Sequence, residues 1–451
     1  MLFIILLLEG FITISVEILT IRQLLPFFGG SVVITSIIIG VFLLFLAVGY
    51  WRGGGHQQDF FKQLSRNFAL SMVWIGIGLS YALIASYYYL SAYIAKLPFL
   101  FNLSLYLLLV LAPIVYFLGQ TIPLTTNLFN QQHRVSHISG RALFLSTIGS
   151  FLGALLTSLL LFQYVGVAWT VVINCVLLYA LILYMRAESQ LPWWRAILLF
   201  LALVFILMLN IDAEKTLFKR TNNYGNYQVV ETKEFDKLLR INQSNSSLLT
   251  VDKKGLPYIE FVRDVLFKQL HLHHKKLLVI GAGGFSLTAA GTHHNDVTYV
   301  DIDPDIRALS EAYFLHQPIH GTFVADDARS YLQQNKTLYD VIFTDAYTQE
   351  ATIPASLLTV EYFQAIANHL NPDGMMIMNI IAHPVFQDDY ARVVFNTIHA
   401  VFPYCALVPL DWRNSLANVI YICPKIADRR LVYHDDLTTA TLDFFKSRHA
   451  E

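Results

Sequence analysis

Four motifs in the second half of the chain carry residues that can bind and process a nucleoside. Each places glycines or an acid directly after a run of apolar residues, and parallel sheets bind ligands at the ends of such strands. A single acid there could simply cap the next helix. Four motifs in chain order favour a pocket for an adenosine-type ligand. Their residues are Gly281 with Gly283, Asp301, Asp327 with Ala328, and Asp345.

Each motif predicts its own contact with such a ligand. Gly281 and Gly283 let the backbone pass close to a ligand at a helix N-terminus. Asp301 follows about 20 residues later, where a carboxylate that binds ribose hydroxyls belongs. Asp327-Ala328 is placed to hydrogen-bond an adenine amino group, and Asp345 leaves a carboxylate on the rim of the sheet.

Several other ligand classes do not fit these motifs. The chain has no Gly-Lys-Ser/Thr element for cradling phosphates, and Ser286 replaces the third glycine of a dinucleotide loop. S-adenosylmethionine or a relative is therefore favoured over a dinucleotide. The histidines, such as His273 and His293, lack acidic partners at ligand spacing, so we expect no metal. The three cysteines show no paired spacing, so we also expect neither a disulfide framework nor a zinc site.

The elements that must position these motifs alternate between strand and helix. We expect a parallel, doubly wound Rossmann-like sheet in residues 274–451, because continuous apolar runs are separated by helical segments such as 361–370 and 389–401. A linker and a small β-subdomain occupy residues 211–273. The predicted strands of the sheet are 277–280, 297–302, 322–325, 341–344, 375–381 and 419–423, and those of the subdomain are 227–231 and 238–241.

The first 210 residues have the composition of a membrane domain. Only 14% of the whole chain is charged, against roughly 25% in a soluble protein. Residues 1–210 hold only 13 of the charged side chains. Neither half of the chain is basic enough to suggest that it binds nucleic acid. About 20 apolar residues span a bilayer as a helix. Seven stretches qualify, at 2–26, 31–51, 68–95, 99–118, 141–162, 165–186 and 192–210.

The predicted spans contain polar and small residues that need an explanation. Glu17 and Arg22 lie in the first span, where they either mark function or lock helices together. Gly149 and Gly153 in the fifth span allow helices to approach closely. Basic residues number seven on the side of the N-terminus and five on the other, which nominally places the C-terminal domain outside. The chemistry needs a cytosolic metabolite, so we expect an inner (cytoplasmic) membrane protein whose soluble domain faces the cytoplasm.

These motifs resemble those of the spermidine synthase-like aminopropyltransferases, in the form fused to a membrane domain. The resemblance covers residues 224–381 and extends to membrane stretches such as 119–123 and 147–154. It implies a β-subdomain followed by a Rossmann-like domain. It also implies transfer of an aminopropyl group from decarboxylated S-adenosylmethionine to an amine, with release of methylthioadenosine and no metal.

The resemblance also assigns roles to individual residues. Gln228 matches a glutamine near the sulfonium donor, and Tyr258 matches a tyrosine that faces both substrates. Asp345 matches the acid thought to accept the proton of the amine. Asp301 and the pair Asp327-Ala328 match the ribose and adenine contacts.

The half of the site that would bind the amine departs from the family pattern. Gly284 and Thr348 stand where the family has aspartates, and Ile259 stands where it has a polar residue. Glu350 is a candidate replacement for one of these acids, or a solvated loop residue.

Three kinds of activity remain open on the sequence. The first is aminopropyl transfer to a small-molecule amine. The second is a lyase or cyclising reaction on S-adenosylmethionine that releases methylthioadenosine without an acceptor. The third is a methyltransferase or a non-catalytic nucleoside-binding membrane protein. The bilayer is the expected partner, and homodimer formation is left open.

Overall fold

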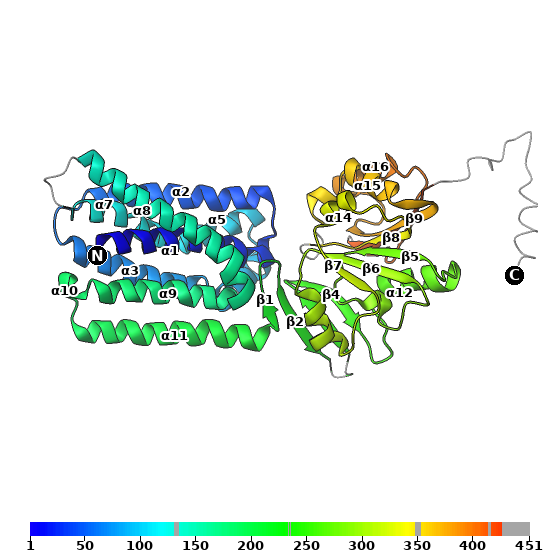
Figure 1. The fold of residues 1–451 in the computed structure, drawn as a ribbon, viewed down its shortest axis with the longest axis horizontal. Helices are drawn as coiled ribbons and strands as arrows, with labels where there is room; N and C mark the ends of the chain where they lie inside the picture. The colour runs from blue at the N-terminus through cyan, green and yellow to red at the C-terminus, as the bar shows by residue number, and fades with distance from the viewer. Residues whose placement is uncertain (130–134, 233, 235, 348–352, 414–415, 426–451) are drawn as a thin grey trace, which may run out of the picture. The chain divides into compact units, whose positions relative to one another are not determined.

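The chain divides into two compact units in the computed structural model, which describes residues 1–129, 135–232, 234, 236–347, 353–413 and 416–425. The first unit comprises Met1–Asp252 with Ala308–Gln317, and the second comprises Lys253–Arg307, Pro318–Tyr347 and the described residues from Ile353 onward. Each unit has its own elements and is described by itself (Figure 1).

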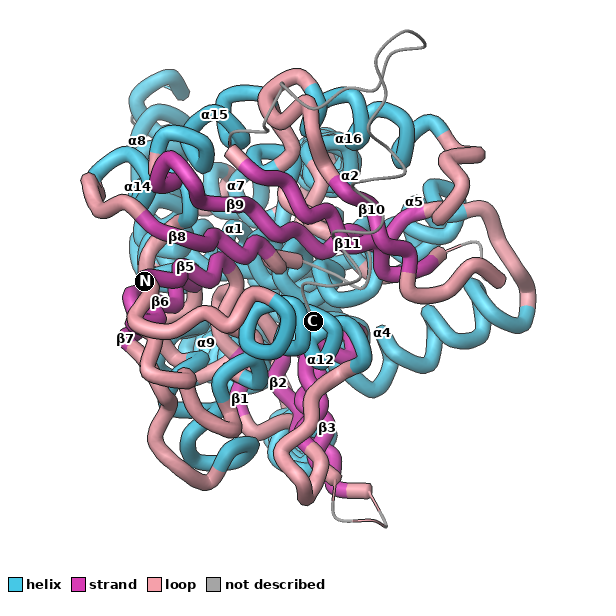
Figure 2. The backbone as a smooth tube through the Cα atoms, turned by 90° about the vertical axis from the view of Figure 1, so that its right-hand side faces the viewer, coloured by secondary structure: helices cyan, strands magenta, loops and turns pink. Residues whose placement is uncertain are grey.

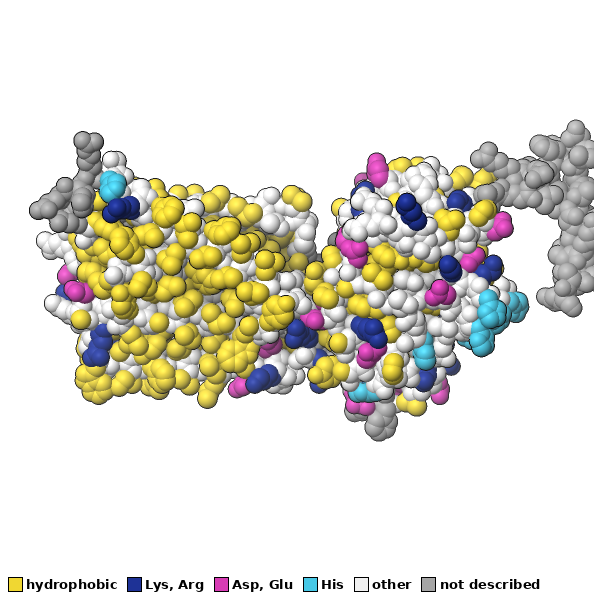
Figure 3. Space-filling view, viewed as in Figure 1, with side chains coloured by type: hydrophobic (Ala, Val, Ile, Leu, Met, Phe, Trp, Pro, Cys, Tyr) yellow, Lys and Arg dark blue, Asp and Glu magenta, His cyan; other side chains and the backbone are white. Residues whose placement is uncertain are grey.

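The first unit contains a bundle of long apolar helices. Within the described residues, six of them are long and apolar enough to cross a membrane, or seven if a bent pair counts as one span. Apolar side chains cover the visible face of this bundle, and charged side chains gather near its ends (Figure 3). The main helices are α1 (Leu2–Phe28), α2 (Val32–Gly54), α3 (Phe60–Gly78), α4 (Tyr81–Tyr88), α5 (Phe99–Leu109), α6 (Leu111–Gly119), α7 (Thr121–Thr126), α8 (Val135–Leu156), α9 (Val167–Tyr184), α10 (Arg186–Ser189) and α11 (Trp193–Leu217).

The span predicted at 68–95 is bent in the structure. The structure has α3 and the segment Tyr81–Ile94 instead, with an angle of 60° between them. Ser80 produces the break, because its hydroxyl accepts a hydrogen bond from the Leu83 backbone N–H and donates one to the Ile77 carbonyl. A serine that caps a helix in this way starts a new helix direction.

Helices α1 and α8 pack with their backbones in contact, as the glycines in the fifth predicted span indicated. A Cβ atom added at Gly149 would collide with the Leu7 carbonyl, and one at Gly153 would collide with the Phe11 carbonyl. Gly10 on α1 faces the Ser146 carbonyl in the same way. Only glycine permits this separation, so these residues set the distance between the two helices.

A four-stranded antiparallel sheet completes the first unit. Its strands, in spatial order, are β1 (Arg220–Thr221), β2 (Asn226–Glu231), β3 (Lys237–Ile241) and β4 (Ser244–Leu249). Arg22 of α1, which is buried, ties this sheet to the bundle: its guanidinium donates to the Asn222 carbonyl and to the Asn226 side chain. Arg22 therefore acts here as a structural link between helix and strand.

The second unit is built on a seven-stranded sheet, visible edge to edge in Figure 2. The parallel part confirms the predicted strand–helix alternation, but the sheet is mixed, because β10 and β11 run antiparallel at one edge. In spatial order the strands are β10 (Ala406–Pro409), β11 (Ala417–Pro424), β9 (Leu370–Ala382), β8 (Tyr339–Thr344), β5 (Lys276–Ile280), β6 (Asp296–Asp301) and β7 (Thr322–Ala325), and the helices include α12 (Pro257–Arg263), α14 (Ala328–Gln334), α15 (Val360–Asn368) and α16 (Asp389–His399).

The expectation of no disulfide is wrong, since Cys405 and Cys423 are bonded to each other. The antiparallel register pairs Ala406 with Ile422, which places Cys405 opposite Cys423 across the β10–β11 hairpin. The 18-residue separation of the two cysteines carries no recognisable spacing, because the hairpin register alone brings them together.

We expect Gly149→Ala to loosen the bundle, because its Cβ would push α8 away from the α1 backbone. The free energy of unfolding should fall by about 1–3 kcal/mol, as for other overpacking changes. Thermal unfolding of the purified chain in detergent measures this. Gly140→Ala on the same helix is the matched control: its Cβ meets open space, so its melting temperature should not decrease. Equal melting temperatures for both variants would contradict the predicted constraint.

Candidate functional site

The carboxyl ends of the parallel strands bring the predicted site residues of the second unit to one edge of the sheet. Asp345 directly follows β8, and its backbone N–H donates to the Ile280 carbonyl at the end of β5. Gly281 has a φ of 90°, and a Cβ there would strike the Asp345 carbonyl. Glycine at 281 therefore lets the turn after β5 pass directly against Asp345.

The Asp345 carboxylate is held by two neutral donors. The Tyr258 hydroxyl donates to Oδ2 at 2.8 Å, and the Asn379 amide donates to Oδ1 at 2.9 Å. Burial raises the pKa of Asp345 to about 7, and these two hydrogen bonds counteract part of that rise. At neutral pH Asp345 therefore exchanges a proton readily, as a general base must.

Tyr258 reaches this carboxylate from helix α12. Pro257 begins the helix, and Glu260 accepts hydrogen bonds from the Gly255 backbone N–H and from Arg263. These contacts fix the first turn of α12, so the Tyr258 ring is held over the sheet edge. Burial and the adjacent Asp345 raise the pKa of Tyr258 well above its usual value, so the phenol remains a donor.

Asn379 and Asn418 are site residues that the sequence analysis missed. The Asn418 amide donates to Asn379 Oδ1 at 2.9 Å, which leaves the Asn379 amide N–H directed at Asp345. Tyr347 braces the same strand, because its hydroxyl donates to the Asn379 carbonyl and accepts from the Ile381 N–H. One signal was available: Asn379 is the polar residue within the apolar run 375–381.

Asp301 and Asp327 lie at the ends of the neighbouring strands β6 and β7. Asp301 accepts hydrogen bonds from the Ala282 and Asp303 backbone N–H groups, which ties it to the glycine-rich turn. Burial raises its pKa from the usual value. Asp327 caps α14 by accepting from Arg329 N and Ser330 N, so it has a structural role of its own. Ala328 is buried in the first turn of that helix, and Gly283 has a φ of 48° in the turn after β5.

Three residues of the predicted site are not among the described residues of the second unit. Gln228 is on β2 and therefore belongs to the first unit. Thr348 and Glu350 lie outside the residues that the structure describes.

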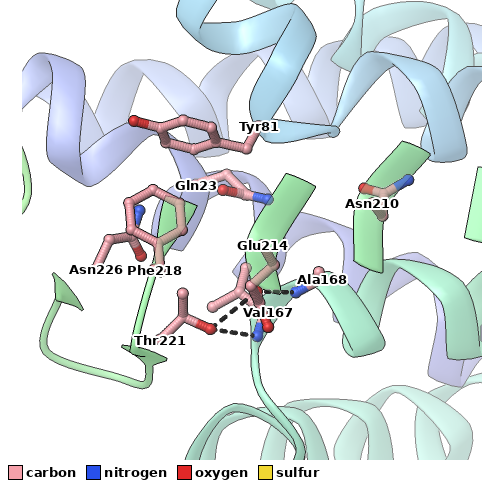
Figure 4. Close-up of a pocket in the computed structure, with 9 residues that line it drawn as sticks. All are labelled: Gln23, Tyr81, Val167, Ala168, Asn210, Glu214, Phe218, Thr221 and Asn226. Carbon is pink, nitrogen blue, oxygen red and sulfur yellow. Dashed lines mark hydrogen bonds between the residues drawn. The ribbon is translucent and has the colours of Figure 1, made fainter. Parts of the chain in front are cut away.

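The first unit contains a small cavity of its own. Its volume is about 10 Å³, enough for one water molecule. Figure 4 shows Glu214 hydrogen-bonded there to Thr221 and to the Ala168 backbone, at the start of α9. Gln23, Asn210 and Asn226 also line it. We assign this polar cluster to the packing of helices against β1 and β2.

The sheet edge combines the elements of nucleoside chemistry with a proton acceptor, Asp345. Gly281, Asp301 and Asp345 are joined through backbone hydrogen bonds between β5, β6 and β8. Within the described part of the chain, no group of three or more His, Cys, Asp or Glu side chains is arranged to hold a metal ion. The geometry can hold a ligand against the turn after β5 and accept its proton at Asp345.

The second unit is similar in sequence to known proteins. Residues 260–421 match the spermine/spermidine synthase domain. A polyamine aminopropyltransferase of Caldicellulosiruptor saccharolyticus is 26% identical over 202 residues, which cover 43% of this chain and 70% of that protein. A probable polyamine aminopropyl transferase of Bifidobacterium longum is 35% identical over 126 residues, 28% of each chain. These relatives are transferases.

Among solved structures, a probable spermidine synthase from Corynebacterium glutamicum is 19% identical. The match covers 49% of this chain and 83% of that one, with a TM-score of 0.38.

The raised pKa of Asp345 predicts how pH affects stability. The folded chain retains a proton between about pH 4 and pH 7 that the unfolded chain releases, so wild-type stability falls as pH rises through this window. Asp345→Asn lacks this group. The free energy of unfolding of this variant, taken relative to that of the wild type, should therefore rise by on the order of 1–3 kcal/mol between pH 4 and pH 8. Denaturant unfolding of both full-length proteins across this pH range measures the difference in stability. A difference that does not change with pH would refute the raised pKa of Asp345.

Proposed function

We propose that this chain, whose residues 260–421 match the spermine/spermidine synthase domain, transfers an aminopropyl group from decarboxylated S-adenosylmethionine to an amine. The observation that carries this proposal is the Tyr258–Asp345 hydrogen bond against the Gly281 turn. It supplies a proton acceptor at the edge of the sheet where the nucleoside motifs converge.

Aminopropyl transfer is a displacement at the carbon beside a sulfonium. The amine nitrogen forms a new bond to that carbon while the carbon–sulfur bond breaks. The electron pair of the broken bond stays on the sulfur and neutralises it, which gives methylthioadenosine. The attacking amine must lose a proton, since its pKa is near about 10 in water. In our proposal Asp345 accepts this proton, and Tyr258 with Asn379 orients the carboxylate.

The donor would lie along the ends of β5, β6 and β7. Asp301 would bind the ribose hydroxyls, and Asp327-Ala328 would bind adenine while Asp327 also caps α14. The turn containing Gly281 and Gly283 would leave room for the backbone to contact the nucleoside.

Product analysis tests this function. Wild-type protein should release methylthioadenosine from decarboxylated S-adenosylmethionine only when an amine is added, as measured by mass spectrometry. Asp345→Asn should reduce turnover at least about 100-fold, the size of a general-base contribution. Asp340→Asn on the same strand is the matched control, because Asp340 bonds Lys276 N and Asn371 at the opposite end of β8 and should leave turnover largely intact.

Binding measurements separate the role of each acid. Asp345→Asn should retain the nucleoside, whereas Asp301→Ala should weaken its binding in calorimetry. Methylthioadenosine from intact S-adenosylmethionine without an amine would instead establish the lyase reaction, and adenosylhomocysteine would establish a methyltransferase. No association with either nucleoside would remove the proposal entirely.

We further propose that the helices cross the cytoplasmic membrane and that the second unit faces the cytoplasm, where the sulfonium donor is made. Six apolar helices of sufficient length support the first part. The Cys405–Cys423 disulfide argues against the second part, because such bonds are more typical of oxidising compartments.

A fluorescent-protein fusion at the C-terminus of the chain decides the topology. Green fluorescent protein folds on the cytoplasmic side and should be bright, whereas alkaline phosphatase fused at the same residue should be inactive. The reverse pattern would place the domain outside the cytoplasm and leave it without access to the proposed donor.

A further inference from the structure

We infer that Glu9, a carboxyl group buried inside the helix bundle, is a site that reversibly binds a proton. The inference concerns the first unit alone and is independent of the transfer reaction proposed for the second. Three features carry it: the burial of Glu9, two hydroxyl partners that suit both of its protonation states, and a helix contact too close to admit a larger cation.

Glu9 lies inside the bundle and not at its end. It stands in the third turn of α1, about 10 Å along the helix axis from the first residue of that helix. Helices α2, α7 and α8 pack against α1 (Figure 1), and the side chain is only 2% exposed. A charged carboxylate in such surroundings is costly unless a cation or several donors offset its charge. The groups that contact Glu9 therefore decide its protonation.

Two hydroxyl groups contact the carboxyl group of Glu9. Thr13 Oγ1 donates to Oε1 at 2.8 Å, and Ser146 Oγ of α8 donates to Oε2 at 3.3 Å. A hydroxyl donates to a carboxylate, and it accepts equally well from a protonated carboxyl group. An arginine or lysine in their place would hold Glu9 in its charged form. In the part of the chain that the structure describes, both hydrogen-bond partners of Glu9 are neutral, so both protonation states are satisfied without rearrangement.

Tyr50 of α2 is a titratable side chain within electrostatic reach of Glu9. It lies four residues before the end of α2 at Gly54 and is 37% exposed. A phenol hydroxyl both donates and accepts hydrogen bonds. Tyr50 therefore connects the buried carboxyl group to the surface at one end of the bundle, from which a proton can enter.

The other helices that pack against α1 add no charge to the surroundings of Glu9 among the described residues. Helix α7 and residues 142–154 of α8 contain no titratable side chain. Helix α6 adds Tyr116, which is neutral at physiological pH. Helix α9 meets α1 nearly two turns further on, where Asn174 donates to Ser15. Glu9 is thus surrounded by neutral groups.

The contact between α1 and α8 limits what the site can bind. Gly10 directly follows Glu9, and a Cβ atom at Gly10 would collide with the carbonyl of Ser146, the residue whose hydroxyl contacts Glu9. A metal cation needs several oxygen ligands arranged around it, as Mg²⁺ and Ca²⁺ do. Two backbones in contact leave no space for such a shell. A proton adds almost no volume, so it is the cation that suits this site.

Infrared difference spectroscopy on the full-length protein in detergent tests the inference. A protonated carboxyl group gives a C=O stretching band that disappears when the proton leaves. We expect this band for Glu9 at neutral pH, its loss as the pH is raised, and its recovery when the pH is restored. Subtracting the spectrum of Glu9→Gln isolates Glu9 from other carboxyl groups such as Asp345. Glu17→Gln is the matched control, since Glu17 is half-buried on the same helix and its replacement should leave the band intact.

The hydroxyl partner on α8 connects the band to the structure. Ser146→Ala removes one hydrogen bond to Glu9, so the band should shift to higher frequency. Ser150→Ala is the matched control: Ser150 also bonds α1, but through the Gly10 carbonyl, so its loss should not shift the band. A purely structural contact between α1 and α8 would make the two variants equivalent in the infrared spectrum.

Salt substitution at constant pH tests whether the ligand is a proton. Replacing choline chloride by sodium, potassium or magnesium chloride at equal ionic strength should leave the Glu9 band unchanged. Loss of the band with any of these salts would assign the site to a metal cation and overturn the inference.

Three further results would also overturn it: a Glu9 band absent at neutral pH, one that persists at every pH at which circular dichroism shows a folded bundle, or one that Ser146→Ala does not shift. Since these spectra contain no contribution from a transfer reaction, none of these results bears on the function proposed for the second unit.

Discussion

The interaction on which the site depends is the pair of neutral hydrogen bonds that holds a buried carboxylate. In the part of the chain that the structure describes, a phenol and an amide bind the two oxygens of Asp345. A salt bridge would lower the pKa of the carboxylate and make it a poor base. Two neutral donors orient the group while its pKa remains near 7, so it can both accept and release a proton.

The architecture around this carboxylate determines its orientation. Gly281 removes the Cβ that would separate β5 from β8, and Asn418 orients Asn379 from an antiparallel strand. The β10–β11 hairpin is thus part of the site and not only the edge of the sheet. Its disulfide cross-links the hairpin that contains Asn418, the residue that orients Asn379 toward Asp345.

The helix bundle is organised by a different constraint, the close approach of backbones. Gly149 and Gly153 bring α8 against α1, and Arg22 then connects α1 to the β-sheet that carries Gln228. Arg22 and Glu214 therefore have clear structural roles, so polar residues within apolar helices do not by themselves indicate transport. In both units glycines let two backbones approach closely, and polar side chains that hydrogen-bond nearby fix how the elements are oriented.

Local pattern determined much of this protein. Apolar runs followed by glycine or aspartate predicted the parallel strands, and their carboxyl ends had to share one edge; family resemblance added Tyr258. Tertiary structure alone decided the rest. The bend at Ser80, the Cys405–Cys423 bond and the Asn418–Asn379–Asp345 chain each depend on residues that become neighbours through packing or strand register. Sequence periodicity reports which face of an element is buried, but not which residue of another element lies opposite it.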